Sequence, residues 1–427
     1  MPPLALQAVI PGEDEPIVLL VRRQAINLQS GADSFSFDCS GRPFGAFWRG
    51  VNYRRSLDNR WLARWRPRAR QPRQVHWLSE AESLAILEAI QALVRKLDAA
   101  LRRGEVQPLG AAAHLSADDL ARAGAALAAV RSWDPAALAA DRDRFLSIYQ
   151  PIGILPPDQY LALVLQATIG CSHNACTFCT FYRDRAFRIK GPDEFAAHIE
   201  AVLAFFGPSI ALRRTIFLGD ANALVIPFPR LRELFAVLAR YVRIETRPAP
   251  PEGATLPPTF AGIYSFMDAF HIHRKSPAEW RWLQAQGLRR VYIGMESGDD
   301  RLLRFLNKPG DAADVVRAVA SLKAADIAVS VIILLGAGGE AYFEDHVAHT
   351  VDALNAMPLG RGDLIYLSDF VELPGSEYGA QAAAAGIQPL SAARLRAQER
   401  LLRAGLRWTD PANAPRLARY DIREFLY

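Results

Sequence analysis

The sequence predicts an α/β protein, in which a partial (β/α)6 barrel follows an N-terminal domain built from a β-meander and helices. From Gln159 onward, near-continuous apolar runs alternate with helical stretches, the pattern of βαβ units in a parallel sheet covered on both faces. Up to about Tyr149, short strands come first and long helices follow. With 427 residues and a hydrophobic fraction of 51%, the chain is long enough for one large domain and one smaller domain.

The N-terminal α+β domain, a support or cap for the barrel, is expected at residues 1–150. A strand is expected at 17–21 and a β-meander at 34–51, because turn residues separate short β-prone runs there. Three helices follow, each opened by a residue that can cap it. The caps are Ser79 with Glu82, Ser116 with Asp119, and Asp134 before Pro135.

The barrel is expected at residues 151–385, as six strands that each lead into a helix. Six such units make an open, partial barrel rather than a closed barrel of eight. A proline-rich surface insertion is expected at 247–258, and a C-terminal helical extension at 386–427. The six strands are expected at 161–168, 214–220, 261–267, 290–296, 328–336 and 363–371, with helices beginning near Pro192, Pro229, Pro277, Asp299, Asp311 and Ala341.

Composition limits the cellular setting. The net charge of +5 permits an acidic partner without requiring one. The longest apolar run near the N-terminus is too short to span a bilayer, so we expect a cytoplasmic protein that does not cross a membrane. Four cysteines are too few for a disulfide scaffold in a chain of this length, which indicates a reducing compartment.

Three of these cysteines, Cys171, Cys176 and Cys179, stand within nine residues, directly after the first expected barrel strand. Loops at the carboxyl ends of barrel strands build active sites. Three thiolates on one loop can each ligate one iron of a cubane cluster, which leaves the fourth iron open for a cofactor or substrate. The alternatives are a zinc site, for which His173 would have to supply the fourth ligand, or three unrelated buried thiols.

The motif around these cysteines, GCSHNACTFCTFY, resembles the radical S-adenosylmethionine (SAM) superfamily, in the branch shared by methylthiotransferases, Elongator-type radical enzymes and coproporphyrinogen-oxidase-like proteins. The spacing here is C-x4-C-x2-C, whereas the family's usual spacing is C-x3-C-x2-C. The resemblance runs from Leu161 to Glu377, about half of the chain. It implies a radical SAM barrel, a [4Fe–4S] cluster on the three cysteines, S-adenosyl-L-methionine as second cofactor, and Phe178 packed near the adenine.

Three later motifs resemble the SAM-binding turns of the family. Each motif also has a structural alternative. These alternatives are that Asp220 only caps a helix, that Glu296 only forms an ion pair, and that the glycines after the fifth strand only form a tight βα turn. In chain order, the candidates are Gly219 and Asp220 of LGDAN for the methionine amino group, Glu296 and Ser297 of YIGMESGDDRLLRFLNKPG for the ribose or amino acid end, and Gly336, Gly338 and Gly339 of LLGAGGE for the adenosine.

The resemblance implies that the reduced cluster cleaves SAM and that the resulting 5′-deoxyadenosyl radical abstracts hydrogen from a substrate. The motifs identify neither that substrate nor a catalytic residue. A reductant such as flavodoxin or ferredoxin is also implied. Only Cys39 remains outside the loop, too few for a second cluster as in methylthiotransferases, and we interpret it as a core residue. The D-x-H-x-x-G pattern of cobalamin-binding domains is missing from the N-terminal part.

Other segments have weaker functional interpretations. Residues 53–77 interleave arginines with Trp61, Trp65 and Trp77, which could contact RNA by charge and stacking, although packing of these residues against the helices is favoured. Four residues beyond the third strand are candidates to hold an anionic substrate at the pocket mouth, or else form a solvated strand end: His271, His273, Arg274 and Lys275. Tyr182 and Arg183 are candidates to line the pocket, or else belong to a solvated turn. The leading hypothesis is therefore a radical SAM enzyme. The alternative is a zinc or iron–sulfur module that binds nucleic acid without radical chemistry.

Overall fold

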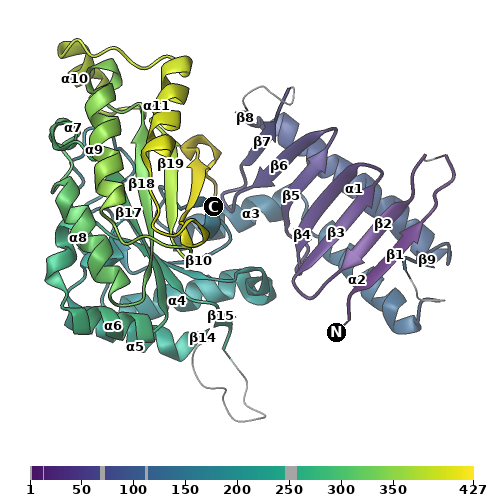
Figure 1. Cartoon of the computed structure of the whole chain (residues 1–427). Helices are drawn as coiled ribbons and strands as arrows, with labels where there is room; N and C mark the ends of the chain where they lie inside the picture. The colour runs from purple at the N-terminus through teal and green to yellow at the C-terminus, as the bar shows by residue number, and fades with distance from the viewer. Residues whose placement is uncertain (1, 13, 68–72, 111–113, 246–256) are drawn as a thin grey trace. The chain divides into compact units, whose positions relative to one another are not determined.

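The computed structural model describes the chain except for residues 1, 13, 68–72, 111–113 and 246–256. The described residues form two compact units (Figure 1). The N-terminal unit comprises Met1–Pro151, Ala201–Arg213 and Leu426–Tyr427, and the barrel unit comprises Ile152–Glu200 and Arg214–Phe425.

Among the described residues, nine strands of the N-terminal unit form one antiparallel sheet. Eight of them are a meander in which each strand pairs with the next, and the ninth returns after the first helix to pair with β1. The meander is longer than the predicted 34–51 and includes the strand predicted at 17–21. Polar residues in most of the other flanking strands make their apolar pattern less regular. The strands are β1 (Leu4–Ala8), β2 (Ile17–Val21), β3 (Ala25–Ser30), β4 (Asp33–Asp38), β5 (Pro43–Trp48), β6 (Val51–Arg55), β7 (Trp61–Trp65), β8 (Gln74–Trp77) and β9 (Gln107–Pro108).

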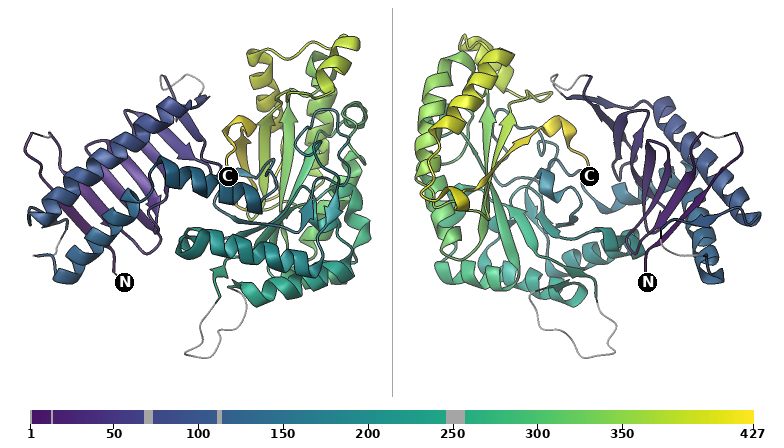
Figure 2. Two further views of the ribbon diagram at one scale, coloured as in Figure 1. Left: turned by 180° about the vertical axis from the view of Figure 1, so that it is seen from behind. Right: turned by 45° about the vertical axis from the view of Figure 1, so that its right-hand side comes forward.

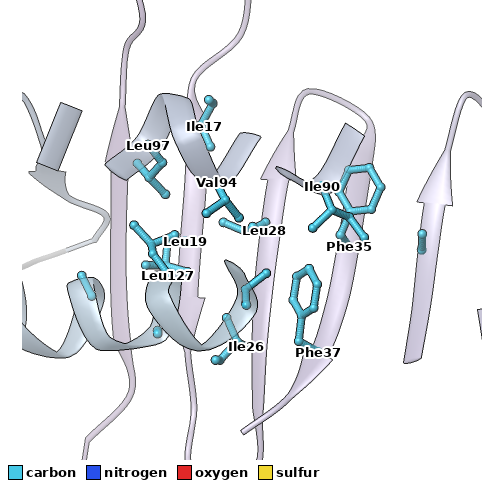
Figure 3. Packing of buried hydrophobic residues seen from close by; sticks show 14 of the residues in the cluster. Ile17, Leu19, Ile26, Leu28, Phe35, Phe37, Ile90, Val94, Leu97 and Leu127 are labelled. Atoms are coloured by element: carbon cyan, nitrogen blue, oxygen red, sulfur yellow. The ribbon is translucent and has the colours of Figure 1, made fainter. Parts of the chain in front are cut away.

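The core of this unit lies between the sheet and two long helices (Figure 3). Alternate residues of the strands, such as Ile17 and Leu19, are buried against Val94 and Leu127 of the helices, as the period of two along a strand requires. The three predicted helix caps are confirmed, two of them as reciprocal capping boxes. The helices are α1 (Glu80–Arg102), α2 (Ala117–Arg131) and α3 (Pro135–Ile148).

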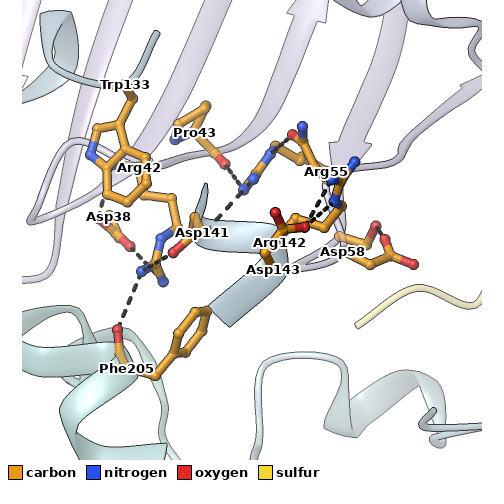
Figure 4. A network of polar contacts seen from close by, with 12 residues as sticks. Asp38, Arg42, Pro43, Arg55, Asp58, Trp133, Asp141, Arg142, Asp143 and Phe205 are labelled. Carbon is orange, nitrogen blue, oxygen red and sulfur yellow. Dashed lines mark hydrogen bonds and ion pairs between the residues drawn. The ribbon is translucent and has the colours of Figure 1, made fainter. Parts of the chain in front are cut away.

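A buried ion network joins the sheet to α3 within the N-terminal unit (Figure 4). Arg42 donates a 2.9 Å hydrogen bond to Asp141, and Arg55 lies 3.8 Å from the other oxygen of that carboxylate. Arg42 also donates to the carbonyl of Phe205 at 3.3 Å. Burial lowers the pKa of Arg55 to about 10, although Asp141 opposes the shift. The exposed fraction of Arg42, Arg55 and Asp141 is at most 5%, so these charges must compensate one another.

Among the residues described for the barrel unit, seven strands form one parallel sheet in chain order. Right-handed crossovers between neighbouring strands place every connecting helix on the same face, so the sheet curls into a partial barrel. This confirms the predicted α/β class. The strands are β10 (Leu163–Gln166), β13 (Ile216–Gly219), β16 (Ile263–Phe266), β17 (Leu288–Glu296), β18 (Ala328–Leu335), β19 (Leu364–Asp369) and β20 (Arg416–Tyr420).

The helices of this unit lie along the outer side of the sheet (Figure 2). The first six begin within two residues of the predicted positions, because prolines and aspartates mark those starts. The helices are α4 (Pro192–Phe206), of which the part up to Glu200 belongs to this unit, α5 (Phe228–Tyr241), α6 (Pro277–Ala285), α7 (Asp300–Phe305), α8 (Ala312–Lys323), α9 (Phe343–Asn355), α10 (Tyr378–Ala384) and α11 (Ala392–Gly405).

The prediction of six strands misses β20. This strand pairs in parallel with β19, so the region 386–427, expected to be helical, contains α11 and then the last strand of the sheet. Its sequence RLARY alternates too weakly in hydrophobicity to reveal an edge strand. Residues 247–256 of the predicted proline-rich insertion lie outside the described residues. The insertion is flanked by the paired strands β14 (Arg243–Ile244) and β15 (Thr259–Phe260).

One segment, Pro192–Leu212, is apolar and long enough to cross a membrane by length and composition alone. It consists of α4 and a following 3₁₀ turn, Gly207–Leu212. Phe195 and Ile199 of α4 are fully buried, as expected of a helix that packs on a protein core. The segment is therefore weak evidence for a membrane span.

Candidate functional site

The three clustered cysteines lie on a loop at the carboxyl end of β10. Two short strands close this loop at its base: β11 (Thr168–Ile169) pairs with β12 (Arg188–Ile189) in antiparallel register. Gly170 turns the chain away from β11 with a φ of +76°, a conformation that suits glycine. The loop thus leaves the sheet and returns to it at the edge where barrel enzymes build their active sites.

Hydrogen bonds within the loop fix its shape. Asn174 has a φ of +47°, and its side-chain amide donates to the carbonyl of Tyr182 at 2.8 Å. Arg183 donates to the carbonyl of Cys176 at 3.0 Å and to that of Cys179 at 3.3 Å. One guanidinium therefore holds the backbone of two clustered cysteines.

The end of α7 anchors the same loop from the other side. The amide of Thr177 donates to the carbonyl of Leu306 at 3.0 Å. The side chain of Asn307 donates to the carbonyl of Ala175 at 2.7 Å, and Nε2 of His173 lies 2.8 Å from the carbonyl oxygen of Asn307. The segment FLNK of the sequence is thus the support on which the cysteine loop rests.

All three clustered cysteines line one pocket of about 220 Å³ inside the barrel unit. Aromatic and aliphatic side chains make up most of the remaining wall. Phe178 of the loop lies on this wall, and its ring centroid is 6.5 Å from that of Phe370. The polar lining residues include Asn222, Asp268, Glu296, Lys308, Ser368 and Asp369.

A buried ion pair lies in the pocket wall beside the cysteines. Lys308 Nζ is 2.9 Å from Glu296 Oε1. Burial alone would lower the pKa of Lys308, but Glu296, Cys176 and Asp268 together raise it above its ordinary value. Burial likewise opposes ionisation of Asp268, yet His271 and Lys308 lower the pKa of that carboxyl. Charged groups of both signs therefore face the pocket.

The donor set fits an iron–sulfur cluster. Within the described part of the chain, no three His, Cys, Asp or Glu side chains converge on a point that a single metal ion could occupy. A cubane does not need this convergence, because each thiolate ligates its own iron. Burial raises the pKa of Cys176 to about 12 and also raises that of Cys179, so metal binding would release their protons.

Of the predicted SAM-binding residues, Phe178 and Glu296 line the pocket. Gly219 and Asp220 are not among the described residues of its lining. Asp220 instead accepts a hydrogen bond from the amide of Gly170 at 3.3 Å and lies 3.7 Å from Arg185. Burial raises its pKa to about 7, although Gly170 and Arg185 oppose the shift. In the structure, Asp220 secures the base of the cysteine loop.

Ser297 also lies outside the described lining of the pocket. It is fully buried, and its hydroxyl accepts a hydrogen bond from the amide of Asp299 at 3.0 Å. The same hydroxyl lies 2.7 Å from Nδ1 of His346 on α9. Ser297 therefore fixes the turn that follows Glu296.

The glycine-rich turn after β18 packs against helices rather than against the pocket, because Gly336, Gly338 and Gly339 are absent from the described lining. A Cβ at Gly338 would lie 2.8 Å from Leu302 of α7, and one at Gly336 would lie 3.0 Å from Leu395 of α11. Both residues have positive φ values. Close packing and backbone conformation account for glycine at these positions, and the contact with adenosine stays a prediction.

Sequence reasoning missed several polar lining residues. Lys308 could have been predicted, because it belongs to the NKPG end of a motif that the sequence already indicated. Asn222 could also have been found, because it is the last residue of LGDAN. Its amide donates to the hydroxyl of Ser172 at 3.1 Å. Nothing in the local sequence singles out Ser368 or Asp369 at the end of a strand.

The segments with weaker interpretations are largely structural. Lys275 is buried and donates to the carbonyls of Leu224 and Ile226. Trp61 is 1% exposed, and the guanidinium of Arg60 stacks 4.5 Å from the ring of Trp77. Residues 68–72 of the arginine-rich run lie outside the described residues. Of the residues considered for the pocket or its mouth, Tyr182 lines the pocket.

Solved structures of radical SAM enzymes are similar to part of this chain. Coproporphyrinogen III oxidase from Escherichia coli is 14% identical, with a TM-score of 0.39, over 57% of this chain and 52% of that one. The methyltransferase TsrM from Kitasatospora setae is 16% identical, with a TM-score of 0.40, over 62% and 57%. The cobalamin-dependent enzyme OxsB is 14% identical, with a TM-score of 0.35, over 57% and 31%. The chain thus spans less than two thirds of each of these structures.

No curated protein matches the sequence. The model of the radical SAM superfamily, in contrast, matches residues 165–352. This range begins within β10, includes the cysteine loop and the pair of Glu296 and Lys308, and ends within α9. Residues 165–352 of this chain are therefore a radical SAM domain.

Proposed function

We propose that the chain is a radical SAM enzyme in which Cys171, Cys176 and Cys179 hold a [4Fe–4S] cluster and the adjoining pocket binds SAM. The observation that carries this proposal is that the three thiols of one loop line a single pocket within the radical SAM domain. When bound, the cluster and SAM supply reductive cleavage of the cofactor and a 5′-deoxyadenosyl radical that acts on a substrate.

Charged residues of the pocket suit the two ends of the methionine part of SAM. Its carboxylate would meet the ammonium group of Lys308, and its amino group would meet the carboxylate of Asp268 or Glu296. Phe178, whose ring lies beside that of Phe370, provides apolar surface for the adenine and excludes water. The other predicted SAM-binding residues lie outside the described lining: Gly219, Asp220, Ser297, Gly336 and Gly338.

Two further proposals concern the surroundings of the enzyme. Cleavage of SAM consumes an electron, so an external reductant such as flavodoxin or ferredoxin would supply it. The three thiols must stay reduced in order to bind a cluster, and a reducing compartment keeps them so. This supports a cytoplasmic location.

The second candidate function is a zinc site without radical chemistry. The observation on its side is that His173 lines the same pocket as the three cysteines. Against it, no three such side chains of the described chain converge on one metal ion. Zinc prefers four ligands of this kind in a tetrahedral arrangement. The nitrogen Nε2 of His173 lies 2.8 Å from the carbonyl oxygen of Asn307, so only Nδ1 would remain for a metal.

One experiment separates the two functions. The protein is purified anaerobically, reconstituted with iron and sulfide, and incubated with SAM and dithionite while 5′-deoxyadenosine is measured by chromatography. We expect production by the wild type and by Cys39→Ala, and none by Cys176→Ala. Cys39 is the matched control because its thiol, in the N-terminal unit, donates to the carbonyl of Pro208. A full cluster without product, or bound zinc in place of iron, would contradict the proposal.

A further inference from the structure

Part of the pocket wall comes from residues beyond the radical SAM domain. Ile154 precedes β10, Asp369 and Phe370 stand at the end of β19, and Tyr420 and Ile422 belong to β20 and the turn after it. All five lie outside residues 165–352. Shared folds keep a common framework and vary the residues that surround it, so this outer wall is where the chain would select its substrate.

The outer wall is mainly apolar. Ile154, Phe370, Leu373 and Ile422 contribute aliphatic and aromatic surface. The ring of Phe370 is held by Tyr378, with centroids 4.5 Å apart. An apolar wall with few polar groups is typical of a pocket that binds the aromatic or aliphatic body of a small molecule.

Asp369 is the charged group of this outer wall. Its Oδ2 lies 2.6 Å from Nη2 of Arg419. Its Oδ1 is buried and, among the residues described, has no hydrogen-bond partner. Buried carboxylate oxygens normally accept hydrogen bonds, and leaving one without a donor is costly. Asp369 also lines the pocket, so a ligand donor there would meet this need once the carboxylate turned toward it.

The charges of the lining favour a cationic donor. Of its carboxylates, Asp268 and Glu296 are assigned to the amino group of SAM, and Glu296 is also paired with Lys308. Asp369 is the carboxylate left for a substrate. The partner of Asp369, Arg419, is half-exposed and shared with Glu399 at 2.9 Å. Solvent weakens such an exposed pair, so negative charge remains for an ammonium group.

We propose that the substrate is an amine with an aromatic or aliphatic body, and that the carboxylate of Asp369 binds its ammonium group while the outer wall holds the body. This inference rests on the proposed function, because the same pocket holds the clustered cysteines. Asp369 has the role of a specificity-determining residue.

The test is a binding measurement with three probes that share one apolar body. Phenethylamine, 2-phenylethanol and 3-phenylpropanoate are titrated into cluster-reconstituted, SAM-bound protein, and each Kd is measured by equilibrium dialysis. We expect phenethylamine to bind at least tenfold more tightly than the other two. Asp369→Asn should reduce this preference to less than threefold. Asp345→Asn should keep it, because Asp345 pairs with exposed Arg301 as Asp369 pairs with Arg419.

Equal affinities for the three probes in the wild type would overturn the inference, and so would an unchanged preference in Asp369→Asn. The wild-type ranking tests the inference even if this variant does not fold. Production of 5′-deoxyadenosine without any probe tests the proposed function separately, so a failure of one can be told from a failure of the other.

Discussion

Lys308 Nζ lies 2.9 Å from Glu296 Oε1, so two residues twelve positions apart form an ion pair in the wall of the cysteine pocket. Glu296 stands at the end of β17 with a φ of +65°, and Lys308 follows the end of α7. The turn that supports the cysteine loop therefore also places a charge in the pocket.

Replacement of Lys308 by methionine should destabilise the barrel unit. The variant leaves the Glu296 carboxylate without its cation in a buried site, which typically costs about 3 kcal/mol or more. Urea unfolding of the metal-free protein measures the change. The double variant Lys308→Met with Glu296→Gln should recover most of the loss. A single variant as stable as the wild type would argue against a buried pair.

The glycine-rich turn should not accept a methyl group at Gly339. Its φ is +56°, and a Cβ would lie 2.9 Å from Ile387 and closer still to the carbonyl of Gln388. Backbone strain and overpacking together predict a loss of about 3 kcal/mol in the free energy of unfolding for Gly339→Ala. Gly362→Ala is the control, because no atom lies within 4 Å of its Cβ position. The control should change stability by less than about 0.5 kcal/mol. Similar losses in both variants would refute this packing argument.

The stability of the protein should depend on pH through His346. Burial lowers the pKa of this side chain to about 4, from an ordinary value of about 6.5. Below pH 6.5 the unfolded chain binds a proton that the folded chain does not, so stability is lost as the pH falls from 6.5 toward 4. The full loss corresponds to about 3 kcal/mol.

His346→Gln removes this titration. Unfolding measured at pH 7 and at pH 4.5 should therefore reveal a smaller loss in the variant than in the wild type. If both lose the same free energy, another group causes the acid sensitivity.

Removal of the Asp141 charge should destabilise the N-terminal unit. Asp141→Asn leaves Arg42 and Arg55 buried without their carboxylate, at an expected cost of about 3 to 5 kcal/mol. Asp143→Asn is the matched control, since Asp143 pairs with Arg142 on the surface and such pairs contribute about 1 kcal/mol or less. Calorimetry should detect an earlier transition in Asp141→Asn alone. Equal shifts in the two variants would exclude a special role of the buried network.

The sequence alone determined the parts that depend on local chemistry. Helix starts were predicted because prolines and capping residues act within one turn. The barrel strands from β10 to β19 were predicted because strands covered on both faces are apolar along their length. The cysteine loop was predicted because its three cysteines are neighbours in the chain.

Tertiary structure decided what depends on pairing between distant segments. The strand β20 exists because β19 offers it an edge, and its own sequence carries little signal. Gly338 and Ser297 lie outside the described pocket lining, whereas Asp369, which no motif indicates, lies within it. A motif fixes which residues are close in the chain, but which side chains face the pocket depends on how strands and helices pack around it.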